Sequence, residues 1–196
     1  MTLATQPLSL DEYLRYDDST DTRYELVNGE LIAMAQPTGQ HGAIAEFLND
    51  AFRAEIKRQQ RDWTAKQMTV AIQSPRGGRW DTARIPDVMV LPLSQWRELR
   101  DQEAIIRLSD APPLLVVEVV SESTRTIDYR AKRVEYNVLN IPEYWIVDPI
   151  DEQVVIFSLV EDLYEAQAFS GGDRLHSLVF PALTLTAAQI LTPEER

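Results

Sequence analysis

Glu118 is the residue whose surroundings point most directly to chemistry. It lies inside the run Leu114–Val120, in which every other residue is apolar. Burying an unpaired carboxylate costs several kcal/mol, so the side chain requires a metal ion, another cation or a proton. The structural alternatives are a pleat position that faces solvent and a buried ion pair with an arginine. We favour a functional role, because the next polar residue after Glu118 is Ser121.

Asp87 provides a second carboxylate at the start of another apolar strand. It follows Pro86 and precedes the apolar residues Val88–Val90. An aspartate alone often marks a strand entrance, but two acids at matching ends of adjacent strands form a cluster of hard oxygen ligands. Such ligands suit Mg²⁺ or Mn²⁺. The pair Asp87 and Glu118 therefore predicts a divalent-metal site.

Lys132 is the cation that could interact with these acids. A helix expected over 127–139 carries Asp128, Lys132 and Tyr136 at steps of four, which places them on one face. The structural interpretation is an Asp128–Lys132 surface pair worth a few tenths of a kcal/mol. In the functional interpretation, Lys132 leans from a partly exposed position toward the acids, where it orients a water molecule or stabilises phosphate charge.

Glu25 and His41 are the remaining candidates. Glu25 shares a strand face with Val27, which predicts a half-buried carboxylate. His41 lies on the apolar stripe of a helix expected over 41–58, one turn before Ile44. A lone histidine on an apolar face is more often a core residue than a ligand, so both interpretations of His41 stay open.

The elements that must position these residues are a mixture of strands and helices. Ser9 and Glu12 form a capping box for a short helix, and Asn28-Gly29 marks the turn of a hairpin over 24–32. The longer helices are expected over 41–58 and 127–139. The predicted strands span 63–72, 85–91, 114–120, 144–147, 153–158, 164–169 and 180–185, and a last short helix begins at Thr186. This order predicts an α/β fold with helices flanking a central mixed sheet, preceded by the N-terminal helix and hairpin.

Composition narrows the possible classes of protein. A chain of 196 residues, 44% of them hydrophobic, suits one domain over 1–196. The net charge of −12 argues against a broad nucleic-acid-binding surface, although local basic clusters occur within Arg53–Lys66 and Arg130–Arg133. The sequence has no cysteine, no apolar run of about 18 residues and no secretory pattern in Met1–Pro7. We therefore expect a cytoplasmic chain without membrane contact.

Several segments, taken in their order along the chain, carry a resemblance to a known family. They are Tyr24–Leu31, His41, Pro86–Val88, Val117–Thr124, Asp128–Tyr136, Pro142–Pro149 and Phe180–Leu185. In these segments the chain resembles the Uma-two family of restriction endonucleases over nearly its whole length. That family is similar to the PD-(D/E)xK nuclease superfamily.

The resemblance implies a restriction-endonuclease-like α/β core and metal-assisted hydrolysis of phosphodiester bonds in DNA with Mg²⁺ or Mn²⁺. Asp87 matches the first acid of the superfamily motif and Glu118 matches the second. Val120 stands where the motif has its lysine. Lys132 on the next helix is the substitute that the resemblance suggests.

The same resemblance gives roles to the other candidates. His41 or Glu25 would assist proton movement or hold the metal. A homodimer would provide one site for each DNA strand. The alternative function is a non-catalytic binding or assembly domain on the nuclease fold, because a fold does not fix a function and the motif lysine is missing.

Overall fold

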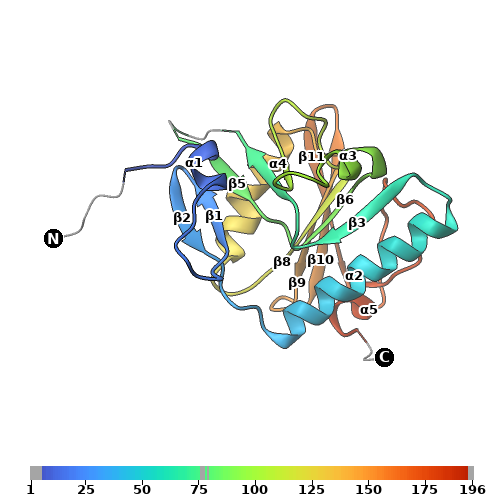
Figure 1. Ribbon diagram of the computed structural model, residues 1–196. Coiled ribbons are helices and arrows are strands. Elements are labelled where there is room, and N and C mark those ends of the chain that lie inside the picture. Colours follow the sequence, from blue (N-terminus) through green and yellow to red (C-terminus); the bar gives the residue numbers. More distant parts are fainter. Residues whose placement is uncertain (1–5, 76–77, 79, 194–196) are drawn as a thin grey trace.

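The computed structural model describes residues 6–75, 78 and 80–193, which form a mixed α/β architecture with two sheets (Figure 1). The larger sheet has six strands in the order β11-β10-β9-β8-β6-β3, and the smaller has five in the order β2-β1-β5-β4-β7. Within the larger sheet β8 and β9 pair in parallel, and the other neighbours pair antiparallel. The predicted α/β class with a central mixed sheet is confirmed.

The strands of the larger sheet are β3 (Trp63–Gln67), β6 (Val88–Pro92), β8 (Leu115–Val119), β9 (Glu143–Asp148), β10 (Gln153–Val160) and β11 (Leu163–Ser170). Those of the smaller sheet are β1 (Tyr24–Val27), β2 (Glu30–Ala33), β4 (Ala71–Ser74), β5 (Thr82–Arg84) and β7 (Ile105–Ile106). The α-helices are α1 (Leu10–Leu14), α2 (Gly39–Arg58), α3 (Leu93–Glu98), α4 (Arg133–Val138) and α5 (Ala187–Leu191), and a π-helix, η1 (Ile127–Lys132), leads directly into α4.

Two hydrophobic cores lie on the two faces of the larger sheet. Val117 and Val119 of β8 belong to the core that α2 and α5 cover. Val116 and Val120 belong to the opposite core, which includes Tyr136 of α4. Because side chains alternate along a strand, Glu118 faces the side of the sheet that carries α4.

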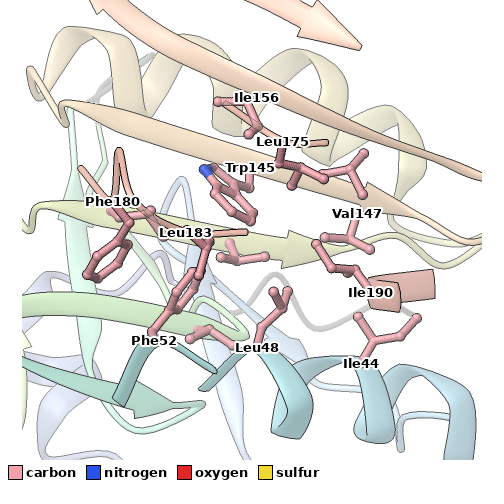
Figure 2. Close-up of a cluster of buried hydrophobic side chains, with 14 of the residues drawn as sticks. Ile44, Leu48, Phe52, Trp145, Val147, Ile156, Leu175, Phe180, Leu183 and Ile190 are labelled. Carbon is pink, nitrogen blue, oxygen red and sulfur yellow. The ribbon is translucent and has the colours of Figure 1, made fainter. Parts of the chain in front are cut away.

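Helix α2 begins and packs as its sequence predicts. Thr38 caps its N-terminus by accepting a hydrogen bond from the His41 backbone N–H. Ile44, Leu48 and Phe52 point from α2 into the core beneath the sheet (Figure 2). Phe52 stacks on Phe180, with 5.2 Å between the ring centroids. Full burial of each such side chain contributes about 1.5–3 kcal/mol, so α2 is held firmly enough to position His41 at its first turn.

The prediction of a single strand over 63–72 is wrong, because the chain passes there from the larger sheet to the smaller sheet. β3 ends at Gln67, and Met68 adopts a left-handed conformation with φ 46°. The Met68 backbone N–H donates to the Asp87 carbonyl oxygen at 3.0 Å. Of the strand predicted over 85–91, only the part from Val88 onward is a strand, as β6, and Asp87 lies in the bend that precedes it.

The strand predicted over 180–185 is also absent from the described residues, where the segment forms turns. Its apolar residues Phe180 and Leu183 are buried as the pattern requires. The backbone is turned because the buried carboxylate of Glu143 accepts hydrogen bonds from the backbone N–H groups of Leu178 and Val179. Tertiary anchoring therefore overrides the local strand pattern.

The helix predicted over 127–139 is present, but its first half is π-helical. π-Helical turns are rare and often occur at functional sites. In this part of the chain the polar residues Asp128 and Lys132 are buried, whereas Ile127, Val134 and Val138 are exposed. No helix of the described residues is long and apolar enough to cross a membrane.

Candidate functional site

Asp87 and Glu118 come together because their strands are antiparallel neighbours. Val88 pairs with Val117 in the ladder between β6 and β8, so the start of one strand meets the end of the other. The Val119 backbone N–H donates to Asp87 Oδ2 at 2.7 Å. Both carboxylates are buried, with 6% of Asp87 and 3% of Glu118 exposed. The sheet therefore brings the two predicted acids to one place on the side of α4.

His41 reaches Asp87 from the first turn of α2. Its Nε2 shares a hydrogen bond with Asp87 Oδ1 at 2.8 Å, and the ring is partly exposed. Burial opposes the charged form of the ring, but the hydrogen bond and the charge of Asp87 outweigh it and raise the pKa of His41 above its usual value. His41 is therefore not sealed in an apolar core, and the core interpretation of this histidine is wrong.

Glu118 is held at both of its oxygen atoms. The Tyr136 hydroxyl donates to Oε1 at 2.7 Å, and the Lys132 ammonium lies 2.9 Å from Oε2. Burial raises the pKa of Glu118 to about 8, the ammonium of Lys132 works in the opposite direction, and the charges of Asp128 and Asp87 raise it further. Glu118 therefore does not face solvent, and its buried ion pair is with Lys132 and not with an arginine.

Lys132 contacts Glu118 directly, as its position on the next helix suggests. It is not partly exposed, however: only 6% of the residue is accessible. The π-helical turn carries it inward against the sheet. Burial disfavours its charge, but the carboxylates of Glu118, Glu25 and Asp128 outweigh this and raise the pKa of Lys132. The ammonium therefore stays protonated among the acids.

Asp128 is a site residue that the sequence interpretation left as one half of a surface pair. It is 1% exposed, and its Oδ1 lies 3.0 Å from the Lys132 ammonium. The direction of this contact does not make a hydrogen bond, so the buried Oδ1 has no hydrogen-bond partner. Burial raises the pKa of Asp128 above its usual value. The sequence carries no local signal for this role, because an amphipathic helix normally buries its apolar face, whereas this one exposes Ile127, Val134 and Val138.

Glu25 lies near the cluster but is held by other partners. Its Oε1 accepts from the Ile85 backbone N–H at 2.9 Å, and its Oε2 lies 3.2 Å from Arg84 Nη1. Arg84 also makes two hydrogen bonds to Glu135 of α4, at 2.9 and 2.8 Å. Within the described ranges, no hydrogen bond or ion pair joins Glu25 to either predicted acid. The negative charge of Glu25 nonetheless contributes to the raised pKa of Glu118.

The chemistry of the donor atoms fits a hard divalent cation. Carboxylate oxygens are the preferred ligands of Mg²⁺ and Mn²⁺, and Asp128 Oδ1 is a buried oxygen that lacks a hydrogen bond. The side chains are not arranged as a ready-made cage, since the described residues contain no group of three or more acidic, histidine or cysteine side chains spaced to hold a metal. All four oxygens of Asp87 and Glu118 already have partners.

The chain is thus an α/β protein whose mixed sheet gathers two acids and a lysine at one strand end. The chain is similar in fold to a solved structure from Anabaena variabilis ATCC 29413, described as "a putative nuclease belonging to DUF820". The TM-score is 0.73 at 20% identity, covering 94% of this chain and 98% of that one.

The family follows from the sequence. The model of the Uma2 family, described as "Putative restriction endonuclease", matches residues 10–188, so the chain belongs to this family. No curated protein matches the chain.

Proposed function

We propose that this protein is a divalent-metal-dependent DNA endonuclease that hydrolyses phosphodiester bonds. The observation that carries the proposal is the direct contact of Lys132 with Glu118, beside Asp87, on a fold of the nuclease class. The family description and the fold support a nuclease. Metal dependence and the assignment of the residues are our inference.

Asp87 and Glu118 would hold Mg²⁺ or Mn²⁺, which when bound polarises the phosphate and lowers the pKa of a coordinated water molecule. The ammonium of Lys132 stabilises negative charge that develops on the phosphate oxygens. His41 orients Asp87 through their shared hydrogen bond and would assist proton movement. Tyr136 fixes the rotamer of Glu118 through its hydrogen bond.

Glu25 takes a more distant part in this proposal. Arg84 and the backbone N–H of Ile85 occupy its carboxylate. Glu25 therefore adds negative charge that keeps Lys132 protonated. A role as a metal ligand would require Glu25 to leave Arg84.

Exposed cations beside the site are the DNA-contacting groups in this proposal. Arg130 and Arg133 lie on either side of Lys132 along η1 and α4, and both are exposed. The basic cluster within Arg53–Lys66 is in part structural. Arg58 pairs with Glu55, and the Lys66 ammonium lies 3.8 Å from the centroid of the Trp96 ring. The surface of η1 and α4 is therefore the better candidate for phosphate contacts.

The test is nicking of a supercoiled plasmid with Mg²⁺, with Mn²⁺ and with a chelator. We expect metal-dependent nicking by the wild type, no nicking by Glu118→Gln, and a rate lower by about 10²–10³-fold for Lys132→Gln. Glu122→Gln is the matched control, because Glu122 is an exposed acid four residues beyond Glu118 and should nick like the wild type. Gln is preferred to Ala at Lys132, since Ala would leave Glu118 and Asp128 without the polar group that both of them contact.

The alternative function, a non-catalytic binding or assembly domain, has an observation in its favour. Val120, at the position of the motif lysine, is buried in the apolar core on the face of Glu118. If the wild type nicks DNA with neither metal, the non-catalytic function replaces the endonuclease. If Glu118→Gln abolishes nicking but Lys132→Gln does not, Lys132 is not the substitute for the motif lysine.

A further inference from the structure

Lys132 occupies one of the oxygens that a metal ion would need. Glu118 Oε2 faces the ammonium at 2.9 Å, and Glu118 Oε1 accepts from Tyr136. Asp87 is similarly engaged by His41 and by the Val119 backbone N–H. A divalent cation that binds Asp87 and Glu118 together must therefore come close to the ammonium. Two positive charges at such a separation in a buried site repel each other strongly.

Asp128 offers the ammonium a second position. Its Oδ1 is buried, lies 3.0 Å from Lys132 Nζ and has no hydrogen bond. Asp128 precedes Lys132 by one turn of the same helix, and a lysine side chain rotates easily about its four-carbon stem. A small rotation therefore exchanges Glu118 for Asp128 without moving the backbone of η1. Asp128 Oδ1 is already 3.0 Å from the ammonium, so the rotation turns this ion pair into a hydrogen bond of better direction.

We propose that Lys132 competes with the divalent cation for Glu118, and that Asp128 receives the ammonium when the metal binds. Lys132 is then an internal cation that sets the affinity of the site for metal. The same movement frees the ammonium from Glu118, so that metal binding and delivery of positive charge to the phosphate are coupled. This inference rests on the metal site of the proposed function but not on cleavage.

The experiment measures Mn²⁺ binding to the full chain by isothermal titration calorimetry, in the absence of DNA. Wild type is compared with Lys132→Met, which keeps the length of the side chain and removes its charge. At a pH where Glu118 is ionised in both proteins, we expect Lys132→Met to bind Mn²⁺ more tightly by about tenfold or more, because the competing charge is gone. The Tm increase on adding Mn²⁺ should also be larger for this variant than for the wild type.

Two further variants keep the result interpretable. Lys132→Gln removes the charge but retains hydrogen bonding, so it should also bind Mn²⁺ more tightly even if Lys132→Met folds poorly. Lys66→Met is the matched control, because Lys66 is a half-buried lysine whose ammonium lies over the Trp96 ring. Its Mn²⁺ affinity should equal that of the wild type.

The role of Asp128 is tested by a double-mutant cycle. Asp128→Asn should weaken Mn²⁺ binding by about tenfold in the wild-type background, because the displaced ammonium loses its second position. In the Lys132→Met background the same change should alter the affinity by less than about threefold. An equal loss in both backgrounds would show that Asp128 acts on the metal directly, and would overturn its role as the receiver of the ammonium.

The remaining outcomes separate this inference from the proposed function. Equal or weaker Mn²⁺ binding by both neutral Lys132 variants overturns the competition while leaving an endonuclease possible. Binding by none of the proteins overturns both the competition and the metal site. Tighter binding by the variants, together with a wild type that never nicks DNA, supports the competition and overturns the endonuclease.

Discussion

Glu118 is a carboxylate inside a core strand, and its protonation controls what the site can bind. Burial raises its pKa to about 8, well above its usual value of 4.5. Below that pKa the side chain carries a proton, which a metal ion must displace. Metal binding at this site is therefore coupled to the loss of a proton from Glu118 at pH values below about 8.

This raised pKa predicts how metal affinity depends on pH. Because the carboxylate form of Glu118 becomes about tenfold rarer for each pH unit below its pKa, the affinity for Mn²⁺ should rise by about that factor per unit from pH 6 to pH 8. It should level off above pH 8. Calorimetry in buffers of different ionisation enthalpy should count about one proton released per Mn²⁺ at pH 6.5. A flat affinity profile with no proton release would contradict the raised pKa.

The sequence identified most residues of the site but not their surroundings. Asp87, Glu118 and His41 were predictable as candidates from the apolar patterns around them, and Lys132 from its spacing on the next helix and from the family resemblance. Asp128 was missed because an Asp–Lys pair four residues apart on a helix is ordinarily a surface feature. The contact of His41 with Asp87 joins residues 46 positions apart, and no local pattern contains that information.

Helix η1–α4 buries polar side chains and exposes apolar ones, which is the reverse of a normal surface helix. Asp128, Lys132 and Tyr136 face the sheet, whereas Val134 and Val138 face outward at 57% and 61% exposure. An amphipathic surface helix normally buries its apolar stripe. The inversion indicates that this element is positioned for its polar side chains and depends on their contacts for stability.

The inversion predicts opposite responses to mutation on the two faces. Tyr136→Phe removes the hydroxyl that donates to buried Glu118, and should lower the free energy of unfolding by about 1–3 kcal/mol. Val134→Lys, on the exposed face, should change it by less than about 0.5 kcal/mol. Urea unfolding followed by circular dichroism measures both. If Val134→Lys proves the more damaging change, the outward face is buried in solution and the described polarity is wrong.

The helices and turns that the sequence predicted correctly are those that depend on local interactions. The capping box at Ser9, the Asn28-Gly29 turn and the apolar stripe of α2 all depend on neighbours within a few residues, and all are present. The change of sheet at Met68 depends instead on a hydrogen bond to Asp87. Such long-range contacts cannot be read from a propensity pattern.

The whole molecule carries a net charge of −12, which sets conditions on any encounter with DNA. An acidic surface repels the phosphate backbone, and this repulsion is screened by salt. Arg130 and Arg133, which are exposed on the helix that carries Lys132, can offset it locally, and a bound divalent cation adds further positive charge. We therefore expect contacts with DNA to be confined to the surroundings of the site.

If each chain carries one candidate site, we can predict the order in which products form from a supercoiled plasmid. A single site reaches one strand at a time, so open-circular DNA should appear first and accumulate at low protein concentration. Linear DNA requires a second cut near the first. If two chains associate on DNA, as the proposed homodimer would, the rate of linear product should rise with about the square of protein concentration.

Gel analysis of a time course at several protein concentrations distinguishes these cases, and sedimentation of the free protein reports its association. A mixture of wild type with an excess of Glu118→Gln is the control. If the chains act in pairs, mixed pairs still nick but rarely linearise, so linear product should fall more steeply than nicked product. Linear DNA that forms without a nicked intermediate at every dilution, with a rate proportional to protein concentration, would mean that the cutting species is already a stable oligomer before it meets DNA.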